Sequence, residues 1–222
     1  MSTVEREDDV ESLEQAFGEL RSLAHRGDDV TAKEWCAFLL GHRGNDPERY
    51  DQVWLPYLMR VKLPVFKVAS IEQGHELLSC LPQGVRFRFV APMRPEDVAT
   101  FLDSPDITKI AELDLSRASI GNLGIASLAA SPLCDGLEAL DLQLNEIGAD
   151  GVAAFVEERM YPRLERLVLS DNDLDNLAAS HIAENLAAPK LAWLDLSRNN
   201  IGPIGQEYLR ASARLENVFL LS

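Results

Sequence analysis

The chain has 222 residues, with 36 acidic and 21 basic side chains and a formal net charge of −15. The acidity is spread along the whole length, whereas a nucleic-acid-binding surface needs a basic stripe, so the composition argues against a nucleic-acid partner. No apolar run reaches the roughly 18 residues of a membrane-spanning helix, and the N-terminus lacks the apolar segment of a secretion signal. Three cysteines form no CxxC pair. We therefore expect reduced thiols and a cytoplasmic protein.

Residues 1–62 are expected to form a small helical region. Apolar residues recur at spacings of three and four between Val10 and Ala24, which predicts an amphipathic helix. Thr31 is a candidate cap for a second helix that Gly41 should end, and Asp46-Pro47 predicts the start of a third. We expect these helices to cap the structure that follows. A coiled-coil dimer through the first helix is the alternative, although its apolar pattern is shorter than a stable coiled coil requires.

Residues 63–109 are expected to hold two degenerate strand–helix units. Phe66-x-Val68 predicts one strand, and residues 71–78 predict the helix after it. Phe87-x-Phe89 predicts a second strand, and Pro95 is a suitable first residue for its helix. Drift from a regular pattern is expected at the end of a repeat array, because the terminal unit must cover the core.

From Ile110 onward the sequence repeats every 27 residues in the frame apolar-x-x-Leu-x-Leu-x-x-Asn-x-apolar. The two leucines share one face of a strand, because strand side chains alternate with a period of two. The asparagine should end the strand by bonding backbone groups that the turn leaves unpaired, and successive copies should form a ladder. The strand leucines and the asparagine position are Leu113, Leu115 and Ala118; Leu140, Leu142 and Asn145; Leu167, Leu169 and Asn172; and Leu194, Leu196 and Asn199.

The first copy carries Ala118 in place of asparagine, so the ladder should begin with the second copy. A shortened fifth copy is predicted at Leu215, Val218 and Leu220. The helical half of each unit also repeats, with a small residue that should let the helix approach the strand and a large core residue one turn later. These pairs are Gly124 and Leu128, Gly151 and Phe155, Ala178 and Ile182, and Gly205 and Leu209.

This unit resembles the ribonuclease-inhibitor class of leucine-rich repeats, whose members include the GTPase-activating protein of Ran, over roughly residues 84–222. The resemblance implies an α/β leucine-rich-repeat solenoid with parallel strands on the concave face and helices on the convex face. We therefore divide the chain into a helical N-terminal cap (1–62), degenerate repeats (63–109) and regular repeats that end in a truncated strand (110–222). Burial of each strand leucine should contribute about 1.5–3 kcal/mol.

No catalytic or cofactor-binding pattern is present in the sequence. The four histidines have no metal-ligand spacing around them, and no phosphate-cradling glycine loop or nucleophile elbow occurs. We expect a protein that is not an enzyme and that carries no cofactor or metal.

The side chains between the strand leucines should face away from the core and form the binding surface for a protein partner. An acidic track is expected along the central column, and exposed tryptophan beside arginine is typical of interface hot spots. The alternative is an ordinary strand surface without a ligand. The predicted partner-binding residues are Asp114, Asp141, Arg166, Val168, Trp193, Asp195, Arg198 and Phe219.

Three functions fit this pattern. The first is a non-catalytic scaffold or adaptor that binds a protein partner on the concave face. The alternatives, which the resemblance implies, are a regulator of a small GTPase and an inhibitor that covers a basic enzyme. The apolar last strand, Leu215 to Leu221, also predicts pairing with another chain at the sheet edge, for example in a homodimer.

Overall fold

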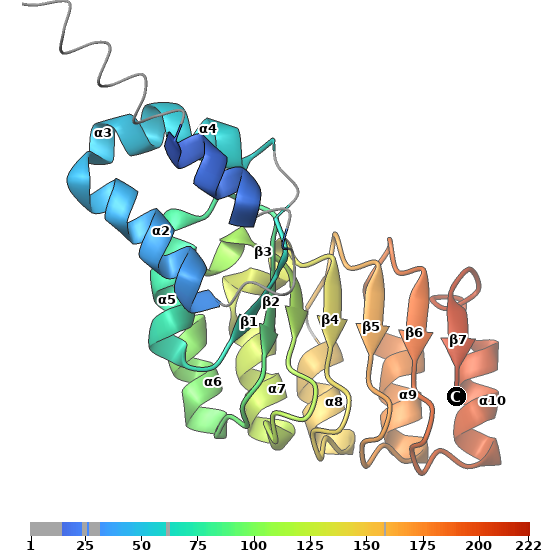
Figure 1. Cartoon of the computed structure of the whole chain (residues 1–222). Coiled ribbons are helices and arrows are strands. Elements are labelled where there is room, and N and C mark those ends of the chain that lie inside the picture. Colours follow the sequence, from blue (N-terminus) through green and yellow to red (C-terminus); the bar gives the residue numbers. More distant parts are fainter. Residues whose placement is uncertain (1–14, 24–25, 27–31, 61–62, 158) are drawn as a thin grey trace, which may run out of the picture.

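The computed structural model describes residues 15–23, 26, 32–60, 63–157 and 159–222. Strands and helices alternate along most of this part, so that the strands line one face and the helices α5 to α10 line the other (Figure 1). The architecture is an α/β leucine-rich-repeat solenoid. None of the helices in these ranges has the length and apolar content needed to cross a membrane.

The strands of the described residues form one parallel sheet of seven, in the order of the sequence from β1 to β7. They are β1 (Val65–Val68), β2 (Val85–Phe89), β3 (Ile110–Asp114), β4 (Ala139–Asp141), β5 (Arg166–Val168), β6 (Trp193–Asp195) and β7 (Phe219–Leu221).

Each of the first six strands is followed by a helix that packs behind the sheet (Figure 1). These helices are α5 (Ile71–Cys80), α6 (Pro95–Leu102), α7 (Gly121–Ala130), α8 (Ala149–Val156), α9 (Asn176–Asn185) and α10 (Pro203–Ala211). Short 3-10 turns, η3 (Ile107–Lys109) and η4 (Pro132–Asp135), precede β3 and β4.

The strand leucines stack in register as the repeat predicts. Leu140 pairs with Leu167, and Leu167 pairs with Leu194 on the next strand. All three side chains are buried and belong to one continuous core. The large helical residues of the pattern, from Leu128 to Leu209, are buried in the same core. The predicted inward face of the strands is therefore confirmed.

The N-terminal helices differ from the prediction at one point. Residues 15–23 are helical, and the rest of the first predicted helix and the predicted cap Thr31 lie outside the described residues. Helix α2 (Ala32–Asn45) runs through Gly41, so the prediction that Gly41 ends it is wrong. The break falls at Asp46, whose side chain accepts from the Arg49 N–H and caps the next helix. Glycine lowers helix stability by only about 1 kcal/mol, which a packed helix tolerates.

The chain after Asp46 continues as α3 (Pro47–Arg49), a π-helical turn η2 (Tyr50–Trp54) and α4 (Leu55–Leu58). Hydrogen bonds from this part and from α2 connect the N-terminal helices to α5. The Tyr50 hydroxyl donates to the Cys80 carbonyl oxygen at 2.6 Å, and Arg43 donates to the Ser79 carbonyl oxygen at 2.6 Å. Trp35 packs edge-on against Phe66 of β1. The helices thus cover the β1 end of the solenoid (Figure 1).

The asparagine ladder is present and begins at Asn145, as predicted. The Asn145 Oδ1 atom accepts from the backbone N–H groups of Ala118 and Ile120 at 3.1 and 3.3 Å, and Nδ2 donates to the Leu115 carbonyl oxygen at 2.8 Å. Asn172 accepts from the Asn145 backbone N–H in the same way, and Asn199 accepts from Asn172. Each amide therefore closes the turn of the unit before its own, which explains why the first copy needs no asparagine.

The small helical residues permit a different close approach from the predicted one. A Cβ on Gly151 would lie 2.5 Å from Asn122 Oδ1 and 2.9 Å from Ile125, and both residues belong to the preceding helix α7. Gly205 stands in the same relation to Asn176 of α9. Gly151 and Gly205 therefore allow neighbouring helices to approach each other, whereas Gly124 is required by its contact with Ile120 in its own unit.

Candidate protein-interaction surface

Two columns of side chains cross the concave face of the sheet, one on each side of the buried leucines. Residues paired between adjacent strands define them. The tryptophan column is Val65, Arg86, Glu112, Ala139, Arg166, Trp193 and Phe219. The aspartate column is Lys67, Arg88, Asp114, Asp141, Val168, Asp195 and Leu221.

Phe219 does not lie where the sequence repeat places it. The shortened last copy predicts it in the central column beside Asp195, but β7 pairs Phe219 with Trp193 and Leu221 with Asp195. The segment between α10 and β7 does not follow the 27-residue spacing. The repeat pattern therefore does not predict this two-residue shift in the register of β7. It keeps the strand parity, so Phe219 still points to the concave side, one column over.

This shift creates an aromatic pair at the C-terminal end of the sheet. The rings of Trp193 and Phe219 are stacked, with centroids 4.6 Å apart and an interplanar angle of 25°. Trp193 is 37% exposed and Phe219 is 56% exposed. Stacking contributes about 0.5–1.5 kcal/mol beyond the area that the rings bury, so the two rings hold each other in place. The pair therefore presents a rigid apolar surface to solvent.

Val168 was predicted to add an exposed apolar group and does not. Its side chain is buried. It lies between Asp141 on β4 and Asp195 on β6. Val168 is therefore a packing residue of the aspartate column rather than a contact surface.

The aspartates line up as predicted, but they do not form a free acidic track. Asp114, Asp141 and Asp195 each accept a hydrogen bond from the backbone N–H two residues later, at 2.9, 3.0 and 2.9 Å. Asp114 also forms an ion pair with Arg88, with 2.5 Å between Oδ2 and Nε. These carboxylates thus hold the turns after their strands, which is a structural role the sequence did not suggest.

Arg198 lies apart from the other predicted residues, on the rim where the chain leaves the strands. The rim consists of Arg117, Leu144, Asp171 and Arg198, which all have positive φ between 54° and 61°. Asp171 accepts from Gln143 at 2.7 Å and pairs with Arg198 at 2.6 Å. The hydrogen bond from Gln143, followed by the Arg198 interaction, lowers the pKa of Asp171. The rim is therefore a fixed polar border.

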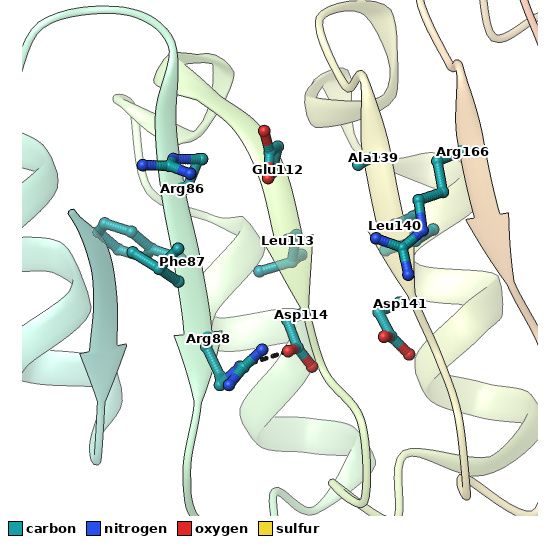
Figure 2. A pocket seen from close by; sticks show the side chains of 11 residues that line it. Arg86, Phe87, Arg88, Glu112, Leu113, Asp114, Ala139, Leu140, Asp141 and Arg166 are labelled. Carbon is teal, nitrogen blue, oxygen red and sulfur yellow. Dashed lines mark hydrogen bonds and ion pairs between the residues drawn. The ribbon is translucent and has the colours of Figure 1, made fainter. Parts of the chain in front are cut away.

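A hollow of about 150 Å³ lies on the concave face between β2 and β5 (Figure 2). Its floor is formed by small or buried residues, and charged side chains surround it. Ala139 leaves the gap, because the neighbouring members of the tryptophan column are Glu112 and Arg166. Figure 2 shows the Arg166 side chain reaching across β4 toward Asp141. The guanidinium of Arg166 has no hydrogen-bond or ion-pair partner among the described residues.

Burial shapes the electrostatics of this hollow. It raises the pKa of Asp141, and Asp114 adds to the rise, although the Gln143 N–H and the two nearby arginines oppose it. Arg86 donates to the Leu63 carbonyl oxygen at 2.7 Å and is thereby held at the edge of the hollow. The hollow is thus a mixed-charge site with an unengaged guanidinium.

The two concave columns carry as many basic as acidic side chains. The basic ones are Lys67, Arg86, Arg88 and Arg166, and the acidic ones are Glu112, Asp114, Asp141 and Asp195. The net charge of −15 therefore resides elsewhere on the chain. Arg86, Glu112 and Ala139 were not among the predicted site residues, although the repeat frame places Glu112 and Ala139 in the same column as Arg166 and Trp193.

The side chains aligned on the concave face can make polar and apolar contacts with a partner. Among the described residues, no group of histidine, cysteine, aspartate and glutamate has the arrangement of a metal site. The predicted residues fall into three sets: Arg166, Trp193 and Phe219 in one column, the aspartates and Val168 in the next, and Arg198 on the rim.

The comparison with protein families agrees with the repeat. A family model described as "Leucine Rich repeat" matches residues 137–156, which include β4 and α8. No curated protein matches the chain. Among solved structures, a chain in the crystal structure of the Rad7 and Elc1 complex in yeast is similar, with 15% identity and a TM-score of 0.47. The match covers 68% of this chain and 37% of that chain.

Proposed function

We propose that this leucine-rich-repeat protein is a non-catalytic interaction module that binds a protein partner on its concave face, as a scaffold or adaptor does. The observation that carries the proposal is the stacked, exposed pair of Trp193 and Phe219 on a sheet face whose two columns also carry eight charged side chains. Tryptophan and arginine are enriched at interface hot spots, and Arg166 is the register neighbour of Trp193.

The hollow extends this surface toward β2. Neighbouring strands are about 4.8 Å apart, so Ala139 on β4 and Trp193 on β6 are separated by roughly 10 Å. We expect the partner to place an apolar side chain on the aromatic pair and a polar side chain in the hollow. In a partner segment with polyproline II conformation, residues i and i+3 share one face and lie about 9 Å apart, which matches this separation.

The proposal is tested by comparing variants in affinity purification from the native cell extract, followed by mass spectrometry. Trp193→Ala and Phe219→Ala should each reduce retention of the wild-type partner by about tenfold or more, because truncation of a hot-spot residue costs about 2 kcal/mol. Trp193→Phe should retain part of the binding. Leu123→Ala, a change at an exposed apolar residue on helix α7, is the control and should bind like wild type.

Thermal unfolding must be measured for the same variants, since a folding defect also reduces retention. We expect a modest fall in the midpoint of the two alanine variants, because loss of the Trp193–Phe219 stack removes about 0.5–1.5 kcal/mol besides the area that the rings bury. If both aromatic variants retain the partner fully, the concave aromatic pair is not the binding surface.

The alternatives differ in how much supports them. The inhibitor alternative requires a free acidic face that covers a basic enzyme. The concave face does not support it, because Lys67 and Arg88 balance the charge of the aspartate column and the aspartates accept the hydrogen bonds described above. A GTPase regulator would use exposed arginines, and Arg88 is already paired with Asp114. The resemblance to the ribonuclease-inhibitor class stays a prediction.

The expected cytoplasmic compartment also belongs to this proposal. Cys36, Cys80 and Cys134 are free and buried. Burial raises the pKa of Cys36 and of Cys134 to about 11, so these thiols stay protonated at neutral pH. Buried protonated thiols are unreactive, which supports a role in packing within a reducing compartment.

A further inference from the structure

The convex face carries a second row of exposed apolar side chains that the concave face does not explain. Leu123 on α7, Leu177 on α9 and Ile204 on α10 occupy equivalent positions of their units and are 71%, 55% and 59% exposed. Tyr208, one helical turn after Ile204, is 46% exposed. Helix α8 has Asp150 at the corresponding position. The row is therefore continuous only on α9 and α10.

Helices α9 and α10 are fixed side by side at this point. The Asn176 Oδ1 atom accepts from the Gly202 and Gly205 N–H groups at 2.8 and 3.1 Å. Leu177 directly follows Asn176 in the sequence, and Ile204 directly precedes Gly205. The two apolar residues thus lie on neighbouring helices in a fixed register. We call Leu177, Ile204 and Tyr208 the helix-side patch.

Acidic side chains outnumber basic ones around the helix-side patch. Helices α7, α8 and α9 contain no lysine or arginine. Asp150, Asp175 and Glu207 are exposed beside or between the apolar positions, and Arg210 is the basic residue of α10. The concave columns, by contrast, contain arginines on β2 and β5. The convex side of the repeats is thus apolar and acidic.

We propose that the helix-side patch docks a partner segment whose apolar residues are flanked by lysine or arginine. A basic segment complements the acidic rim and would associate faster at low salt. A second copy of the chain is disfavoured as the occupant, because it would bring an identical acidic rim and a net charge of −15. This proposal is independent of binding on the concave face.

The spacing of the anchors favours a helical segment. Packed helices are about 8–10 Å apart, and seven residues of an α-helix rise about 10.5 Å. Residues i and i+7 of an amphipathic helix can therefore reach Leu177 and Ile204, while a residue at i+3 or i+4 from the second anchor meets Tyr208.

The test uses a phage-displayed library of random peptides of about twelve residues, which allows three helical turns. Peptides are selected on the full chain and then sorted by the loss of binding to the Leu177→Ser/Ile204→Ser variant. We expect the peptides that lose at least about tenfold in affinity to be enriched in lysine and arginine with apolar residues at helical spacing, and to weaken between about 50 and 300 mM salt.

Controls separate this surface from the rest of the molecule. Leu123→Ser, the same substitution at the equivalent position of α7, should leave peptide binding unchanged, and so should Trp193→Ala. The proposal is overturned if no selected peptide distinguishes the double variant, or if the distinguishing peptides lack basic residues. Sedimentation that shows a dimer of the wild-type chain, lost in Leu177→Ser/Ile204→Ser, would assign the patch to self-association and overturn it as well.

Discussion

The interior of the regular repeats and their concave face follow opposite rules, although the same strands build both. Inside, the same residue types recur in every unit: leucine faces the core, and asparagine closes the turn from Asn145 onward. In the tryptophan column of the concave face the residue changes from strand to strand, from Ala139 to Arg166 to Trp193. The residues that repeat in each unit therefore specify the solenoid, and the residues that differ between units form the contact surface.

Substitution of a repeated core leucine should have the largest effect on stability. Leu167 is buried at the centre of the strand stack. We expect Leu167→Ala to lower the free energy of unfolding by about 2–5 kcal/mol through lost burial and a cavity. Leu144→Ala, at an exposed leucine on the rim, is the control and should change it little. Urea denaturation measures both, and equal losses would remove the distinction between interior and surface.

The asparagine ladder should come next in magnitude. Asn145→Ala should cost about 2–4 kcal/mol, because buried backbone groups such as the Ile120 N–H lose their side-chain partner at about 1–3 kcal/mol each. Asn200, the exposed neighbour of Asn199, provides a control in Asn200→Ala, which should be near wild type. A small effect of Asn145→Ala in chemical denaturation would show that water replaces the amide.

The contact between neighbouring helices should have a smaller effect. Gly151→Ala places a Cβ 3.0 Å from the Asn122 backbone as well as against its side chain, and such overpacking costs about 1–3 kcal/mol. The cost should fall in the Asn122→Ala background, where part of the clash is absent. A double-mutant cycle measures this coupling. Strict additivity would contradict the close approach of α7 and α8.

Two aspartates on the concave side should respond to pH with opposite signs. Burial raises the pKa of Asp141, so its ionised form opposes folding at neutral pH, and this cost disappears as the pH falls through the raised pKa. Hydrogen bonding lowers the pKa of Asp171, so its stabilisation is present above the unfolded value and is lost as the pH falls through the folded value.

The corresponding substitutions give the smallest expected effects. Asp141→Asn should raise the unfolding midpoint slightly at pH 7, and Asp171→Asn should lower it, with both differences shrinking in acid. Thermal denaturation at several pH values measures them. Shifts of the same sign for the two variants would contradict the assigned environments.

Most of the fold was predictable because it depends on periodic residues. The inward leucines, the asparagine ladder and the helix start at Asp46-Pro47 each follow from local side-chain chemistry that the sequence displays. Gly41 was misjudged because tertiary packing outweighs the small cost of glycine in a helix. The close approach of neighbouring helices at Gly151 depends on Asn122, which is remote in sequence and outside the frame.

The candidate surface was only partly predictable. The repeat frame places Trp193 and the aspartates on the correct face. It cannot show which carboxylates accept a hydrogen bond from the backbone N–H group two residues later. The position of Phe219 depends on how the non-repetitive segment before β7 folds, and the burial of Val168 depends on its neighbours' side chains. These are properties of packed neighbours, whereas the frame describes one unit at a time.

Binding at the aromatic pair is tested most directly by photo-crosslinking from position 219. The chain with Phe219 replaced by p-benzoylphenylalanine is illuminated in the native extract, with Leu123 replaced in the same way as the control. We expect a protein adduct from position 219 that disappears in the Trp193→Ala background, and none from position 123. No adduct at position 219, or one that persists without Trp193, would contradict binding at the aromatic pair.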